Sequence, residues 1–211
     1  MISKLNNYTN MDLKEIAKGI NDAVENRRQE LEMSFVEKWH TYYMKDVDGK
    51  VKSHFPSVSK IMKKFFPPFN QQEMALKVAK GDKEKAKQLI AEWSLAGKIS
   101  VNIGSRTHYL LEEDVVGKYG NYKELRQPEF ECDEPQTERS DNMVIAGQKY
   151  IDLMHERGAV SVDTEMILGD PILGYTGQGD NTWLMENRKR DGFGLVISDW
   201  KTNQPKNFLS W

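Results

Sequence analysis

The fold is decided by two stretches late in the chain, Gly174-Tyr175-Thr176-Gly177-Gln178-Gly179-Asp180 and Leu195-Val196-Ile197-Ser198-Asp199-Trp200-Lys201. Side chains of a strand alternate between its two faces, so Ile197, Asp199 and Lys201 share one face. Charges beside apolar side chains are costly unless they are paired or bind a cation. Taken alone, the Asp-x-Lys pattern fits either a salt-bridged strand end or part of a catalytic site.

Asp180 favours the catalytic interpretation. It opens a strand expected over 181–186, and a charged turn at 187–192 joins that strand to the one expected over 194–201. Such a hairpin can bring Asp180 and Asp199 side by side, where two carboxylates repel each other unless a cation lies between them. Oxygen ligands of this kind select Mg²⁺ or Mn²⁺. The two stretches therefore predict a divalent metal site.

Asp180, Asp199 and Lys201 make chemical sense as a set for phosphodiester hydrolysis. That reaction needs a hydroxide near neutral pH, stabilisation of the charge on phosphorus and help for the leaving oxygen, all of which a carboxylate-held metal can supply in part. A nearby lysine can orient the attacking water or stabilise the developing negative charge.

Working outward, helical patterns precede a run of strands. Helices are predicted over 11–44, 58–66, 71–96 with an interruption near Gly81, 105–116 and 143–157. Short strands are expected at 42–45 and 50–55 around an Asp48-Gly49 turn, and later strands at 160–168, 172–177, 181–186 and 194–201. The polar, acidic stretch 127–141 is interpreted as a solvated loop. This order predicts an α/β fold whose mainly antiparallel sheet comes late and is flanked by helices.

Bulk composition excludes several classes. The chain has 211 residues, 38% of them hydrophobic and 29% charged, which suits one elaborated globular domain. No run of about 18 apolar residues and no signal peptide are found, so a cytoplasmic location is expected. Cys132 is the single cysteine, which excludes an internal disulfide and a cysteine-based zinc site. A net charge of −2 does not itself indicate nucleic-acid binding, although a local basic groove can lie on a neutral protein.

Four stretches in order resemble the PD-(D/E)XK nuclease superfamily, and within it the RecB-like exonucleases, which include phage exonucleases, Cas4-type nucleases and the mitochondrial genome maintenance exonuclease. They are Phe55-Pro56-Ser57-Val58-Ser59, Gly104-Ser105-Arg106-Thr107-His108-Tyr109-Leu110-Leu111-Glu112, Gly177-Gln178-Gly179-Asp180 and Val196-Ile197-Ser198-Asp199-Trp200-Lys201-Thr202. The resemblance implies a restriction-endonuclease-like core over 55–211, preceded by a helical region and hairpin over 1–54.

The resemblance also implies roles for individual residues. Metal ligands would come from four positions: His108, Asp180, Asp199 and the carbonyl of Trp200. Lys201 would be the catalytic lysine, and Glu112 would orient His108 or a metal-bound water. Glu165 lies on the first late strand, where some members carry an acidic catalytic residue. The hairpin tip Arg188-Lys189-Arg190 would contact DNA phosphates.

The function implied is Mg²⁺-dependent (or Mn²⁺-dependent) hydrolysis of DNA from its ends, in recombination, repair or phage DNA processing, and in the host cytoplasm if a phage encodes the chain. The alternative is a catalytically inactive nuclease-like module that binds DNA or serves as a scaffold. Family members continue past the Asp-x-Lys strand into a helix and further strands, whereas this sequence stops at Trp211. We therefore expect a truncated chain, or a homo-oligomer or partner chain that completes the fold.

Overall fold

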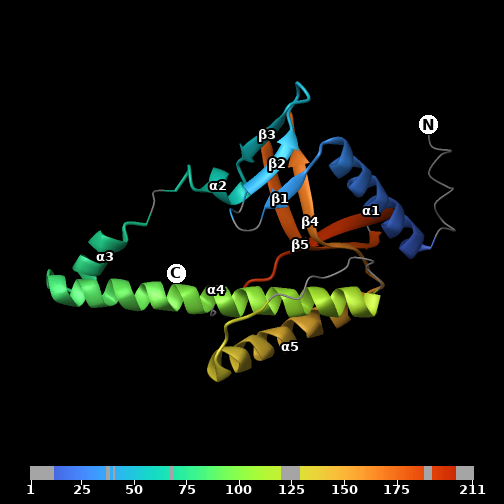
Figure 1. Cartoon of the computed structure of the whole chain (residues 1–211). Coiled ribbons are helices and arrows are strands. Elements are labelled where there is room, and N and C mark those ends of the chain that lie inside the picture. The colour runs from blue at the N-terminus through green and yellow to red at the C-terminus, as the bar shows by residue number, and fades with distance from the viewer. Residues whose placement is uncertain are drawn as a thin grey trace.

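The computed structural model describes residues 12–36, 39, 41–66, 69–119, 129–187 and 192–202. Its elements in chain order are α1 (Leu13–Glu30), β1 (Ser34–Val36), β2 (Thr41–Lys45), β3 (Val51–Phe55), α2 (Val58–Met62), α3 (Gln71–Val78), α4 (Lys83–Tyr119), α5 (Glu134–Glu156), β4 (Val160–Asp170), β5 (Tyr175–Asn187) and β6 (Gly192–Ser198). This part of the chain is a mixed α/β structure with two three-stranded antiparallel sheets (Figure 1).

The larger sheet has the strand order β4-β5-β6 and lies between helices. Trp183 and Leu184 are consecutive and both buried, so they enter two different cores. Trp183 packs with residues of α4 and α5, including Leu111 and Ile151. Leu184 packs with Ala17 and other residues of α1. The sheet is therefore covered by α1 on one face and by α4 and α5 on the other (Figure 1).

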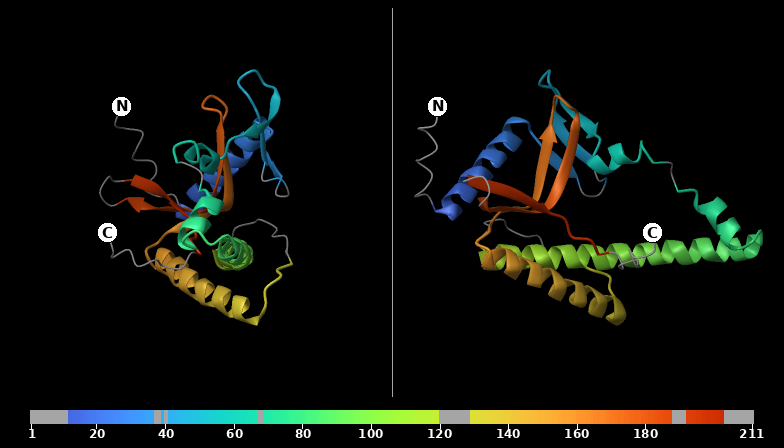
Figure 2. Two further views of the ribbon diagram at one scale, coloured as in Figure 1. Left: turned by 90° about the vertical axis from the view of Figure 1, so that its left-hand side faces the viewer. Right: turned by 180° about the vertical axis from the view of Figure 1, so that it is seen from behind.

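α4 is one continuous helix of 37 residues, about 55 Å long at 1.5 Å per residue. Its C-terminal half packs on α5 and the sheet, whereas its N-terminal half extends beyond the body and carries α3 (Figures 1 and 2). Ala75, Ala79 and Ala86 form the small core that fixes α3 on α4. Near the middle of α4, a Cβ at Gly104 would lie 3.1 Å from Oγ1 of Thr202. The chain leaving β6 therefore passes close to α4, one turn before His108.

The smaller sheet, β1-β2-β3, packs beside the larger one. Its core contains Leu31, Met44 and Phe55. A parallel bridge between Ser57 and Thr176 then joins the segment after β3 to the start of β5. The N-terminal region is thus attached to the strand that carries Asp180.

Several predicted boundaries are wrong for physical reasons. The helix expected over 11–44 ends at Glu30. Phe35 and Tyr42 have a spacing that would continue the apolar stripe of this helix, but they lie on a hairpin, where their ring centroids are 4.6 Å apart across β1 and β2. The two helices expected over 71–96 and 105–116 are α3 and the single helix α4, and α2 ends at Met62 rather than at residue 66.

Two further corrections concern the second half of the chain. Within the stretch 127–141, where the sequence predicts a loop, residues 134–141 are the start of α5, because Asp133 caps that helix and acidic residues in a first turn are favourable. Residues 129–133 lie outside helices and strands, and 127–128 lie outside the described residues. The strands expected at 172–177 and 181–186 are one strand, β5, preceded by a turn in which Gly174 has φ +68°. Among the helices within the described ranges, none is long and apolar enough to cross a bilayer.

Candidate metal centre

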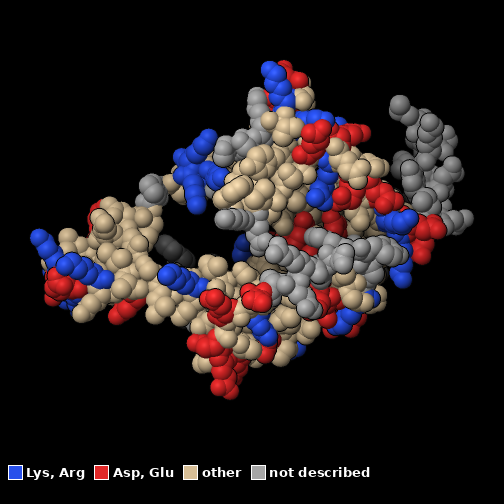
Figure 3. Space-filling model, viewed as in Figure 1, with Lys and Arg blue, Asp and Glu red and all other residues tan. Residues whose placement is uncertain are grey.

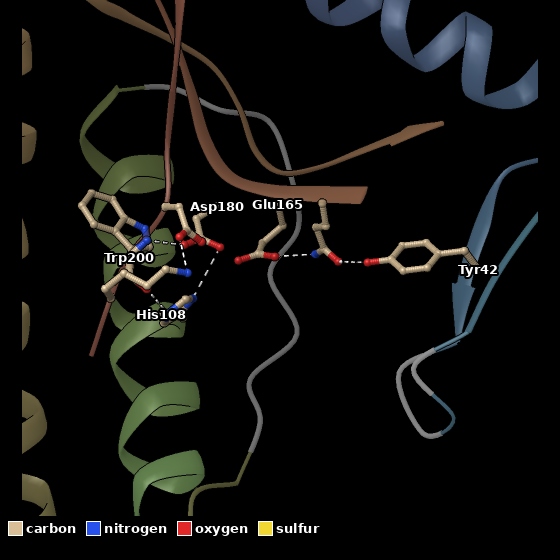
Figure 4. Close-up of polar contacts among 8 residues, drawn as sticks. Tyr42, His108, Glu165, Asp180 and Trp200 are labelled. Atoms are coloured by element: carbon tan, nitrogen blue, oxygen red, sulfur yellow. Dashed lines mark hydrogen bonds and ion pairs between the residues drawn. The ribbon is translucent and has the colours of Figure 1, made fainter. Parts of the chain in front are cut away.

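Three side chains from three elements converge beside the middle of the large sheet. His108 of α4, Glu165 of β4 and Asp180 of β5 each offer one ligand atom, and these atoms lie within 4.8 Å of one another. Figure 4 shows His108 reaching from the helix toward Asp180, with Glu165 on the neighbouring strand. This is the one group of three or more potential metal ligands that the described residues contain.

Strand register explains the two carboxylates. Thr164 pairs with Asn181 and Met166 pairs with Gly179, so Glu165 lies opposite Asp180. Directly opposed side chains share a face of an antiparallel sheet. Glu165 also has φ +51°, a left-handed conformation that costs on the order of 1 kcal/mol for a non-glycine residue. Strain of this kind gathers at functional sites, where the surrounding structure holds it in place.

Packing of α4 explains His108. Leu111 and Val115, three and seven residues further on, are almost fully buried against the sheet and α5. Residues at this spacing lie on one helix face, so His108 faces the sheet as well. The sequence predicts this orientation, and the structure places Nδ1 of His108 3.6 Å from Oδ1 of Asp180.

The backbone of Trp200 holds both partners. Its N–H donates to Oδ2 of Asp180, and its carbonyl lies 3.0 Å from Nε2 of His108. A carbonyl oxygen can only accept, so Nε2 must carry the proton. Nδ1 is then the imidazole nitrogen that can bind a metal, and the backbone contact fixes the ring orientation.

The 3.6 Å between Nδ1 of His108 and Oδ1 of Asp180 is long for a hydrogen bond. It matches two neighbouring ligands on one ion, because bonds of about 2.1 Å at about 90–120° put ligand atoms roughly 3.0–3.6 Å apart. The donor set, one imidazole and two carboxylates, fits a divalent first-row ion, with Mn²⁺ suiting the nitrogen better than Mg²⁺ does. The residues present therefore fit the expected cation.

The charges of the cluster shift both partners toward their ionised forms. The Asp180 carboxylate raises the pKa of His108 above its usual value, while burial opposes that change and Glu165 adds to it. Burial alone would raise the pKa of Asp180, but contacts with His108, the Trp200 N–H and the charge of Lys201 lower it instead. Asp180 is therefore a carboxylate at neutral pH, as a metal ligand must be.

Glu165 is held by a relay that leads away from the helix. Nε2 of Gln178 donates to Oε2 of Glu165. The hydroxyl of Tyr42 donates to Oε1 of Gln178 over 3.2 Å. Burial, with the charge of Glu165, raises the pKa of Tyr42, so its hydroxyl stays protonated. Figure 4 shows the relay crossing from the large sheet to β2.

No role for Gln178 or Tyr42 follows from the sequence analysis. The sequence nevertheless contains a signal for Gln178, because Gln178 precedes Asp180 by two residues and strand alternation puts both side chains on the same face. Tyr42 carries no local signal, since its contact with Gln178 joins residues 136 positions apart.

Three other predicted site residues, Asp199, Lys201 and Glu112, lie in the described part of the chain. Asp199 forms an ion pair with Lys201 and stands outside the three-residue cluster, so a metal shared by Asp180 and Asp199 stays a prediction. Glu112 accepts a hydrogen bond of 3.1 Å from Thr164, the neighbour of Glu165, and its role in orienting His108 or a metal-bound water stays a prediction. The tip Arg188-Lys189-Arg190 lies outside the described residues.

Comparison of the chain with protein-family models, with curated proteins and with solved structures gave no match. The interpretation of the centre therefore depends on its own geometry and chemistry.

Proposed function

We propose that this chain is a Mg²⁺- or Mn²⁺-dependent nuclease that hydrolyses DNA phosphodiester bonds from DNA ends, built on a restriction-endonuclease-like core. The observation that supports it best is the convergence of His108, Glu165 and Asp180 with Lys201 close enough to lower the pKa of Asp180. An imidazole, two carboxylates and a nearby lysine suit reactions in which phosphate must be bound and a water activated.

Each residue has a task in this proposal. His108, Glu165 and Asp180 hold the cation, which supplies an activated water and neutralises phosphate charge when bound. The backbone of Trp200 and the amide of Gln178 keep these ligands oriented. Such support of ligands by neighbouring groups is general in metal sites.

Lys201 stands on the solvent side of the centre. Its side chain is 73% exposed and is paired with Asp199. A surface pair of this kind is weak, so Lys201 can leave Asp199 and donate to a phosphate oxygen. Its ammonium would stabilise charge that grows in the transition state, which affects the rate more than the binding of DNA.

Cleavage of end-labelled linear DNA by the full chain with Mg²⁺ or Mn²⁺ tests the proposal. Asp180→Asn should lose both metal binding and cleavage. Lys201→Ala should lose about 10²–10³ in rate while keeping most DNA binding. Asp22→Asn on α1 and Lys149→Ala on α5 are matched controls, because both residues are exposed and lie outside the cluster.

Two outcomes contradict the proposal. If Asp180→Asn and Lys201→Ala cut DNA at the wild-type rate, Asp199 and Lys201 are only a salt-bridged strand end. If the unaltered chain binds DNA but never cleaves it with either metal, the inactive binding module is the correct interpretation.

A further inference from the structure

The charge distribution separates one segment from the rest of the chain. Residues 49–72 contain five lysines and no Asp or Glu, in a protein whose net charge is −2. Within the segment, Lys60, Lys63 and Lys64 are exposed on and just after α2. Figure 3 shows basic side chains gathered over α2, at the edge of an opening between α2 and α4. A polyanion is the partner that such a segment fits.

Three aromatic rings accompany these lysines. Phe65, Phe66 and Phe69 are 75%, 61% and 70% exposed, which is unusual for large apolar side chains. The ring of Phe69 lies 6.2 Å from that of Trp93 on α4, so the third ring is held against the projecting helix. Exposed aromatic faces beside lysines are the combination on which unpaired bases stack while phosphates are neutralised.

The segment is joined directly to the metal centre. Ser57, at the start of α2, forms a bridge with Thr176 of β5, and the N–H of Thr176 bonds to the carbonyl of Pro56. Asp180 lies four residues further along the same strand, on the order of 13 Å away. A strand bound along the segment would therefore have a phosphate within reach of the centre after a few nucleotides.

We propose that Lys60, Lys63, Lys64, Phe65, Phe66 and Phe69 form a binding surface for single-stranded DNA that feeds the metal centre. Duplex DNA hides its base faces and offers only phosphates to such a surface. An anionic membrane would also attract lysines and phenylalanines, but it would have no reason to approach a half-buried cluster that contains two carboxylates. The choice of DNA among polyanions rests on the proposed nuclease function.

Equilibrium binding tests the surface without cleavage. The probes are fluorescein-labelled oligothymidine, an abasic phosphodiester of equal length and a duplex of equal length, each with the full chain in EDTA. Oligothymidine should bind most tightly. Replacing Phe65 and Phe66 together by Leu, which keeps apolarity and removes the rings, should weaken its binding about tenfold or more. Replacing Phe65 and Phe66 together by Trp, which keeps aromatic rings at both positions, should keep oligothymidine binding near the wild-type level. The abasic probe should not respond to either change.

Salt dependence separates the lysines from the rings. The double change of Lys63→Ala and Lys64→Ala should reduce the slope of log affinity against log salt by about 0.7 per lysine. Ile145→Ala and Lys149→Ala on α5 are matched controls with exposed side chains and should leave binding unchanged. Wild-type melting temperatures for all variants would show that the fold is intact.

The proposal is overturned if the Leu variant binds oligothymidine as the wild type does, or if the abasic probe or the duplex binds equally well. Sedimentation with phosphatidylserine vesicles in place of DNA binding would overturn it in favour of a membrane surface. Failure here is distinguishable from failure of the nuclease proposal. Metal-dependent cleavage without an effect of the Phe variants on binding would support the nuclease proposal and contradict the binding surface. Ring-dependent binding without cleavage would support the binding surface and contradict the nuclease proposal.

Discussion

Loss of the Gln178 amide should weaken metal binding more than loss of the Tyr42 hydroxyl, and the two losses should not add. Gln178 donates to a carboxylate, and hydrogen bonds to charged groups contribute about 1.5–3 kcal/mol, with the lower end applying to an exposed bond such as this one. Tyr42 donates to a neutral amide over 3.2 Å, a bond worth about 0.5–1.5 kcal/mol. Supporting contacts of this kind commonly change metal affinity by about 10–100-fold. We therefore expect Gln178→Leu to weaken Mn²⁺ binding by about 10–100-fold and Tyr42→Phe by less than about 10-fold.

Isothermal titration calorimetry with Mn²⁺, without DNA, measures both effects. Gln178 bonds to both Tyr42 and Glu165, so the two changes should be coupled, and the double variant should lose less than the sum of the two single effects. Tyr43→Phe is the matched control, since Tyr43 is a tyrosine of the same strand that takes no part in the described bonds to Gln178 and Glu165. Unchanged Mn²⁺ affinity in Gln178→Leu, or additive effects in the double variant, would refute the relay.

Three further outcomes are expected. In EDTA, the free energy of unfolding should fall as pH rises through the raised pKa of His108, because the charged imidazole that pairs with Asp180 stabilises the fold fully only below the ordinary pKa near 6.5. Urea titrations from pH 5 to 9 should show a smaller fall in a His108→Gln variant than in the wild type, and equal profiles would contradict the pairing. Over the same range Mn²⁺ affinity should rise, since the ion competes with a proton for His108, and a pH-independent affinity would remove His108 from the ligands. Gly147→Ala should destabilise the protein by about 1 kcal/mol net, because its Cβ would lie 2.6 Å from two carbons of Leu111 and the overpacking cost of about 1–3 kcal/mol exceeds a helix-propensity gain of about 1 kcal/mol. Gly97→Ala is the control, because its Cβ meets open space and the change should be stabilising. Equal melting temperatures for the two variants would show that α4 and α5 are not closely packed at Gly147.

The parts of the centre set by local periodicity could be predicted from sequence. His108 is predicted to face the sheet because Leu111 and Val115 share its helix face. Late strands are predicted from alternation and turn residues, although the sequence predicts two strands where the structure has the single strand β5. The antiparallel order of those strands also follows from the short connections between them.

The parts set by register and distant contact could not be predicted. Glu165 faces Asp180 only because β4 and β5 pair as they do, with a shift between Ser161 and Asp163. A shift of one residue would send Glu165 to the other face, and nothing in the sequence specifies that choice. The strand expected over 194–201 ends at Ser198, so Asp199 and Lys201 lie after β6, where strand alternation does not fix their faces. The Asp-x-Lys spacing also does not tell whether the two residues pair with each other or with an ion.

Trp200 contributes to the centre through its peptide group, and its indole ring packs edge-on against Tyr150, 5.7 Å away, outside the cluster. Every residue type except proline supplies the same N–H and carbonyl. Evolution is therefore free to vary the side chain at this position among rings that fill the same space, while the hydrogen bonds to the centre persist unchanged. In an alanine scan, a change at position 200 would reduce stability through lost packing. A search for invariant residues would not identify the position, because its side chain can vary. Only proline, which removes the N–H, would expose the position as part of the centre.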